Sequence, residues 1–157
     1  MADADRTHTN PAPALIAIDT NVLVYAHRED ALFHDAALSC VTRLAEGRSP
    51  WAIPWPCVHE FFAIVTHKRI YNPPTGASQA IAQIEAWMES PSLVLLAESG
   101  VHWAQLKALL LRAKTAGPAV HDARIAALCL QHGAAELWSA DRDFSRFAGL
   151  KVVNPLV

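Results

Sequence analysis

Short apolar runs alternate with longer amphipathic stretches along the chain. The apolar runs contain no polar alternation, which is typical of strands that are buried on both faces of a parallel sheet. Prolines at positions 50 and 54 limit the second run to a few residues. We expect five short strands, at residues 15–18, 51–53, 93–96, about 137–139, and 151–153.

Helical periodicity occupies the segments between these runs. A short helix is expected to begin at Val22, with Thr20 or Asn21 as its cap. Apolar residues at three- and four-residue spacing place Leu38 and Trp103 on inward helix faces. Six or seven helices against five strands predict an α/β fold with a parallel sheet and helices on both sides. The longer helices are expected at residues 33–45, 56–66, 77–88, 101–113 and 120–130.

Composition fits one compact domain. The chain has 157 residues, of which 52% are hydrophobic and 18% charged, so it can bury one substantial core. Residues 1–13 are polar and contain two prolines, so we expect a flexible tail before a single domain at residues 14–157. The net charge of -2 excludes a globally basic nucleic-acid binder but leaves room for a local basic patch.

The cysteines and the hydropathy pattern indicate where the protein works. Cys40, Cys57 and Cys129 lie among apolar neighbours without a C-x-x-C pair, which is typical of buried thiols. No apolar run reaches membrane-spanning length, and we find no signal peptide. We therefore expect a cytoplasmic protein without a membrane partner.

Several familiar catalytic motifs are absent. The sequence has no G-x-G-x-x-G, no G-x-x-x-x-G-K-[ST] and no G-x-S-x-G, so dinucleotide binding, P-loop chemistry and the hydrolase elbow lack support. His59 and Glu60 begin like the zinc motif H-E-x-x-H, but Ala63 stands where the second histidine is required. The candidate chemistry therefore rests on carboxylates.

Four acids recur where an α/β site would lie. Asp19 follows the first strand, Glu60 faces an apolar helix stripe, Asp122 opens a helix, and Asp141 follows the fourth strand. Each has a structural alternative, since the aspartates can cap helices and Glu60 can pair with Lys68 or an arginine. Together they can converge on one pocket, where carboxylates in that number require a cation such as magnesium or manganese.

The ordered motifs resemble a known family. IDTNVLVYA, VHEF, VHDARIAA, LWSADRDFSRF and KVVNPL are similar to PIN-domain ribonucleases, specifically the VapC-type toxins of type II toxin–antitoxin systems. The resemblance spans residues 15–156. It implies a three-layer α/β/α sandwich, frequent homodimers and a cognate antitoxin partner. It also implies that the catalytic and metal-binding residues are Asp19, Glu60, Asp122 and Asp141.

The same resemblance leaves two positions with less defined roles. Asp143 matches a further acid that is often present in the family. Ser139 stands where many members have a threonine that helps to hold the first acid or a water. With one or two magnesium or manganese ions, the acids would activate water for attack on an RNA phosphodiester. Arg124 lies two positions after Asp122 on the helix, so we expect a surface or interface charge rather than a catalytic one.

Acidic sites repel RNA, so basic residues must hold its backbone. Two alternatives to a toxin ribonuclease are a non-catalytic PIN-like module that binds RNA or a partner, and a metal-dependent DNA nuclease. A phosphoacceptor receiver domain is disfavoured because the third strand ends in LLAES without an aspartate. Candidate RNA-contacting residues are Arg28, Lys68, Arg69, Arg112, Lys114, Arg124 and Arg142.

Overall fold

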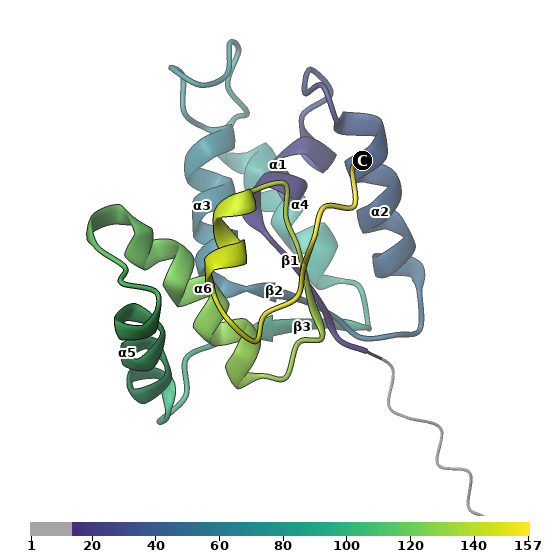
Figure 1. The fold of residues 1–157 in the computed structure, drawn as a ribbon. Helices are drawn as coiled ribbons and strands as arrows, with labels where there is room; N and C mark the ends of the chain where they lie inside the picture. The colour runs from purple at the N-terminus through teal and green to yellow at the C-terminus, as the bar shows by residue number, and fades with distance from the viewer. Residues whose placement is uncertain (1–13) are drawn as a thin grey trace, which may run out of the picture.

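A five-stranded parallel sheet forms the centre of the structure, a computed structural model that describes residues 14–157 (Figure 1). The strand order is β3-β2-β1-β4-β5, and every neighbouring pair is parallel. The tail expected at residues 1–13 lies outside the described residues. The strands are β1 (Ile16–Ile18), β2 (Trp51–Pro54), β3 (Leu93–Leu96), β4 (Glu136–Trp138) and β5 (Val152–Val153).

Helices cover both faces of this sheet (Figure 1). On one face, α1 packs against both α2 and α3, and α3 packs against α4; on the other face, α5 packs against α6. This arrangement confirms the predicted α/β/α sandwich. The helices are α1 (Thr20–His27), α2 (His34–Glu46), α3 (Trp55–Val65), α4 (Ala77–Met88), α5 (His102–Arg112) and α6 (Val120–Gln131), with short 3-10 helices η1 (Gly117–Ala119) and η2 (Arg142–Arg146).

The core lies at the interface between the sheet and its helices. Ala17 of β1 pairs with Ala52 of β2 and with Leu137 of β4, and all three are fully buried. On α6, Ala123, Ala126 and Ala127 are also fully buried, and their small side chains let the helix backbone approach closely. The three cysteines are free and buried, as predicted.

The chain reverses its direction of strand addition beside β1. It adds β2 and then β3 on one side of β1, and it then crosses to the other side to add β4 and β5. In parallel sheets the crevice at such a switch point is the usual ligand site. This point lies between the carboxyl ends of β1 and β4, which Asp19 and Ser139 follow.

Some local predictions were wrong. Helix α1 begins at Thr20 and Asp19 is its cap, because the Asp19 carboxylate accepts a hydrogen bond of 2.8 Å from the Thr20 N–H. Strand β3 is at the sheet edge and Val94 is exposed, so it is not buried on both faces. Leu38 and Trp103 are also exposed, since periodicity identifies a helix face but not how much of it is covered.

None of the helices described at residues 14–157 is both long and apolar enough to cross a membrane.

Candidate metal-binding active site

Asp19 is the buried end of the candidate site. Its exposed fraction is 5%, and its Oδ2 accepts a hydrogen bond of 2.6 Å from Ser139 Oγ. Cys57 Sγ lies 3.7 Å from its Oδ1. Burial raises the pKa of Asp19 to about 6, and repulsion from Glu60 and Asp122 acts in the same direction against the hydrogen bonds from Ser139 and the Thr20 N–H. Asp19 is therefore both a helix cap and a buried acid whose ionised form is disfavoured.

Ser139 connects the ends of two neighbouring strands. Besides donating to Asp19, its buried Oγ accepts hydrogen bonds from the Asp141 N–H at 3.0 Å and from Asn21 Nδ2 at 3.3 Å. The Ala140 N–H donates to Asn21 Oδ1 at 3.2 Å. These contacts fix the position of Asp141 relative to Asp19 across the switch point.

Glu60 enters the site from α3. Thr20 Oγ1, buried at the start of α1, donates a hydrogen bond of 2.8 Å to Glu60 Oε2. Among the described residues, no Lys or Arg nitrogen lies within 4.0 Å of this carboxylate, so the alternative of an ion pair with Lys68 is not realised. The side chain is held by a hydroxyl rather than neutralised by a cation.

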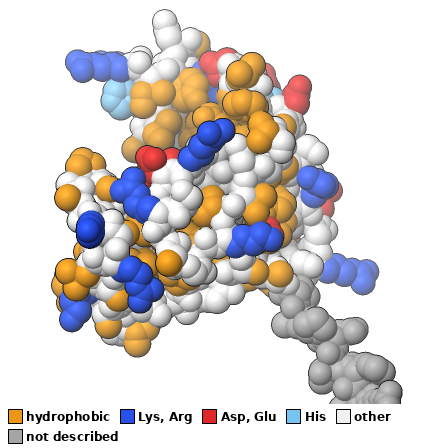
Figure 2. All heavy atoms as spheres, viewed as in Figure 1, with side chains coloured by type: hydrophobic (Ala, Val, Ile, Leu, Met, Phe, Trp, Pro, Cys, Tyr) orange, Lys and Arg blue, Asp and Glu red, His pale blue; other side chains and the backbone are white. Residues whose placement is uncertain are grey.

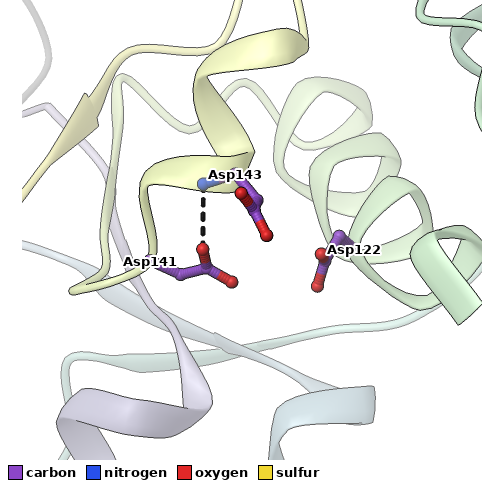
Figure 3. Close-up of side chains that lie close together, drawn as sticks. All are labelled: Asp122, Asp141 and Asp143. Carbon is purple, nitrogen blue, oxygen red and sulfur yellow. Dashed lines mark hydrogen bonds between the residues drawn. The ribbon is translucent and has the colours of Figure 1, made fainter.

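Three more carboxylates face one another at the open side of the site (Figure 3). One oxygen from each of Asp122, Asp141 and Asp143 lies within 4.8 Å of the others. Asp122 comes from the first turn of α6, whereas Asp141 caps η2 and accepts a hydrogen bond of 2.8 Å from the Asp143 N–H. This local turn brings Asp143 back toward Asp141.

The electrostatics of this open group are unfavourable without a cation. Burial raises the pKa of Asp122, and repulsion from Asp141, Glu60 and Asp143 raises it further. Arg146 opposes this shift from η2, where its Nη2 lies 4.0 Å from Asp143 Oδ1. One arginine at the rim does not neutralise several carboxylates. An all-oxygen donor set of this kind fits a hard divalent cation.

The structure therefore brings the sequence-predicted acids into one region in two groups. Asp122 and Asp141 join Asp143 in the compact group, while Asp19 and Glu60 lie outside that group but close enough to repel Asp122. Sequence reasoning treated Thr20 only as a possible cap and did not place it against Glu60. Its position directly after Asp19 at a strand end is the signal that could have indicated this role.

Comparisons with known proteins show which family this chain is similar to. Residues 16–150 match the PIN domain family. Ribonuclease VapC43 of Mycobacterium tuberculosis is 33% identical over 142 residues, which is 90% of this chain and 96% of the relative. Ribonuclease VapC48 of the same species is 31% identical over 137 residues, covering 87% of this chain and 94% of the relative.

Solved structures show the same fold at lower sequence identity. VapBC2 from Rickettsia felis, bound to a DNA fragment from its promoter, gives a TM-score of 0.65 at 17% identity and covers 88% of this chain and 97% of that one. VapC20 of M. tuberculosis, described as a sarcin-ricin loop cleaving toxin, gives 0.63 at 18% identity and covers 86% and 95%.

The chain belongs to the PIN-domain family. Within that family it belongs to the VapC ribonucleases, as its relatives at 31–33% identity over nearly the whole chain show.

Proposed function

We propose that this protein is a metal-dependent endoribonuclease that acts as the toxin of a toxin–antitoxin pair. The observation that carries the proposal is the group of carboxylates from β1, α3, α6 and η2 at the switch point between β1 and β4, in a chain of the VapC family. Clustered acids repel one another, which costs stability. Acids that only cap helices could do so at separate places, so capping alone does not explain the cluster.

We assign the metal to Asp19, Glu60, Asp122 and Asp141, with Asp143 as a further ligand. The oxygen-only donor set and the raised pKa values of Asp19 and Asp122 support magnesium or manganese. When bound, such an ion supplies a Lewis acid that lowers the pKa of water and offsets the charge that develops on the scissile phosphate.

The remaining side chains hold these acids in place. Ser139 and the Thr20 N–H orient the two oxygens of Asp19, and Thr20 Oγ1 fixes Oε2 of Glu60. The second oxygen of Glu60 would then be free to bind the ion. These residues fix the acids before substrate arrives.

The partners follow from the relatives. Solved structures of related fold contain VapB with VapC, which supports an antitoxin partner for this chain. We also propose RNA as the substrate, a homodimer as the assembly and the cytoplasm as the compartment. The free buried thiols of Cys40, Cys57 and Cys129 fit a reducing compartment.

Cleavage of matched nucleic acids tests the enzyme proposal. The purified protein should cut single-stranded RNA with magnesium or manganese, and EDTA should abolish the cutting. Asp122→Asn should be inactive, whereas a DNA strand of the same sequence should stay intact. Cutting that persists after chelation would exclude the metal mechanism. Preferential cutting of DNA would favour the DNA nuclease, and binding without cutting would favour a non-catalytic module.

Growth tests the toxin proposal separately. Expression of the parent should arrest growth unless the cognate antitoxin is co-expressed, and Asp122→Asn should be tolerated. Normal growth with abundant, folded and catalytically active protein would exclude the toxin role while leaving the nuclease in place.

A further inference from the structure

Helix α5 carries Lys107 and Arg112 but no Asp or Glu. Residues 99–121 contain Lys107, Arg112 and Lys114 but no Asp or Glu, in a chain whose net charge is -2. All three side chains are exposed. Figure 2 shows Lys and Arg side chains gathered over the part of the molecule that α5 occupies in Figure 1.

These three cations also differ from several others in lacking acidic partners. Arg28 lies 2.6 Å from Asp30, and Arg124 lies 3.2 Å from Glu98. Lys151 lies 3.1 Å from Glu136. Within residues 14–157, no carboxylate oxygen lies within 4.0 Å of the Lys107, Arg112 or Lys114 nitrogens. Their charge is therefore available to an anionic ligand.

The chain links the C-terminal end of α5 to the start of α6, where Asp122 lies. Helix α5 packs against α6, and Asp122 lies in the first turn of α6. Only residues 113–119 separate the end of α5 from the start of α6, so Arg112 and Lys114 lie at the end of the helix pair that carries Asp122. A chain of phosphates that passes the acids can reach them.

Lys114 occupies a backbone position that favours glycine. Its φ is 51°, and the turn is closed by hydrogen bonds from the Lys114 N–H to Leu111 O at 3.4 Å and from the Thr115 N–H to Leu110 O at 2.9 Å. Glycine is preferred at this point of such a turn because it has no Cβ. A lysine at this position therefore costs stability relative to glycine, and such outliers are found at functional positions.

An aromatic side chain accompanies the cations. Trp103 is 64% exposed and lies one helical turn from Lys107, and Leu111, one turn further, is 74% exposed. Flat aromatic surface next to cations suits nucleic acid, because bases stack on the ring while phosphates contact the amines. A second copy of the chain fits less well, since two-fold packing of this face would bring Lys107 toward its own copy.

We propose that Trp103, Lys107, Arg112 and Lys114, here called the α5 ridge, bind the RNA strand on one side of the bond that is cut. The proposal rests on the proposed function and adds where its substrate docks. The α5 ridge holds phosphates and one base, and the acid group cuts the neighbouring bond.

The salt dependence of cleavage tests the α5 ridge. We compare the parent, the triple variant Lys107→Gln, Arg112→Gln and Lys114→Gln, and a control variant with Arg43→Gln and Arg48→Gln. The control cations are exposed and lie at α2, which Figure 1 shows on the opposite side of the molecule from α5. We expect the triple variant to lose about tenfold or more in kcat/KM through KM, and the slope of log kcat/KM against log salt to flatten by about 2. The control should match the parent.

Two further variants distinguish base stacking on Trp103 from phosphate contacts with the cations. Trp103→Ala should raise KM without changing the salt slope, because stacking releases no counterions. Lys114→Gly should raise Tm by about 2–4 °C while raising KM, which a purely structural residue would not do.

Three other outcomes would contradict the α5 ridge or the proposed function. A triple variant with the parent's KM and salt slope would overturn the α5 ridge while leaving the nuclease intact. A changed sedimentation coefficient with unchanged KM would identify the face as a protein contact instead. Failure of the parent itself to cut RNA would overturn the proposed function, and binding of the same RNA measured by fluorescence anisotropy would still decide the docking surface.

Discussion

At the scale of single residues, Asp19 shows that a helix cap and a candidate catalytic acid can be the same side chain. One of its oxygens caps α1 and the other accepts from Ser139 at the end of β4. The two interpretations of the sequence therefore do not exclude each other. A local cap motif was visible in the sequence, but the contact with Ser139 joins residues 120 positions apart and depends on the strand order.

The buried charge of Asp19 should appear in the pH dependence of stability. Its pKa rises from 3.8 to about 6 in the folded state, so folding favours the protonated acid. Ionisation between about pH 4 and pH 6 should lower the free energy of unfolding by about 3 kcal/mol, with no further loss above that range.

Melts of the parent and of Asp19→Asn in EDTA, from pH 4 to pH 8, provide the measurement. As the pH rises from 4 to about 6, the parent should lose stability through ionisation of Asp19, whereas Asp19→Asn should not. The variant should therefore become more stable relative to the parent over this interval. A constant difference between the two proteins would show that Asp19 ionises in the folded state as it does in the unfolded chain.

Arg124 is predicted to be dispensable for cleavage. It pairs with Glu98 at 3.2 Å on the surface, away from the acid group on its own helix. Exposed ion pairs contribute little, so Arg124→Ala should change stability by less than about 1 kcal/mol and leave kcat within about twofold. A folded but inactive Arg124→Ala protein would mean that the RNA path crosses this part of α6.

At the scale of elements, the alternation of apolar runs and amphipathic segments was sufficient to predict the order of strands and helices. Helix α4 coincides with its predicted bounds, because twelve residues of clear periodicity follow a proline-rich loop. The exposure of Trp103 and Val94 was not predictable, since it depends on which neighbours cover a helix face or a strand edge. The approach of Asp143 to Asp122 likewise depends on the tight turn of η2.

A hydrogen bond between α1 and α3 carries a further prediction. Thr20 Oγ1 is the donor that fixes Glu60, and partly buried Glu60 can replace this bond with water. Thr20→Val should therefore cost about 1 kcal/mol or less in stability but reduce kcat by about tenfold or more. Thr20→Ser should restore kcat, because it restores the hydroxyl.

Kinetics and chemical denaturation of the two Thr20 variants provide the measurement. If Thr20→Val kept the parent's kcat, the position of Glu60 would not depend on this hydrogen bond.

At the scale of the whole molecule, the parallel sheet positions chemistry that its local segments cannot show. Asp19, Ser139 and Asp141 meet because β1 and β4 are parallel neighbours in the sheet, although Asp19 and Ser139 are 120 positions apart in the sequence. The sequence pattern predicted parallel strands, and the resemblance to the PIN family supplied the set of acids. The separation of Asp19 and Glu60 from the open group of Asp122, Asp141 and Asp143 required the structure.

We propose that these acids form one metal site rather than separate caps. Two like charges about 4 Å apart repel by roughly 4 kcal/mol at an effective dielectric constant near 20, so removal of one charge should relieve the metal-free fold. Replacement of a simple cap Asp by Ala would instead cost about 1 kcal/mol regardless of metal.

Thermal melts of the parent, Asp19→Asn and Asp122→Asn, in EDTA and in excess magnesium, test this claim most directly. Both variants should melt at or above the parent's Tm in EDTA, and both should lose most of the rise in Tm that magnesium gives the parent. If both melted below the parent in EDTA and kept its full magnesium shift, the acids would be structural caps and the nuclease site would lie elsewhere.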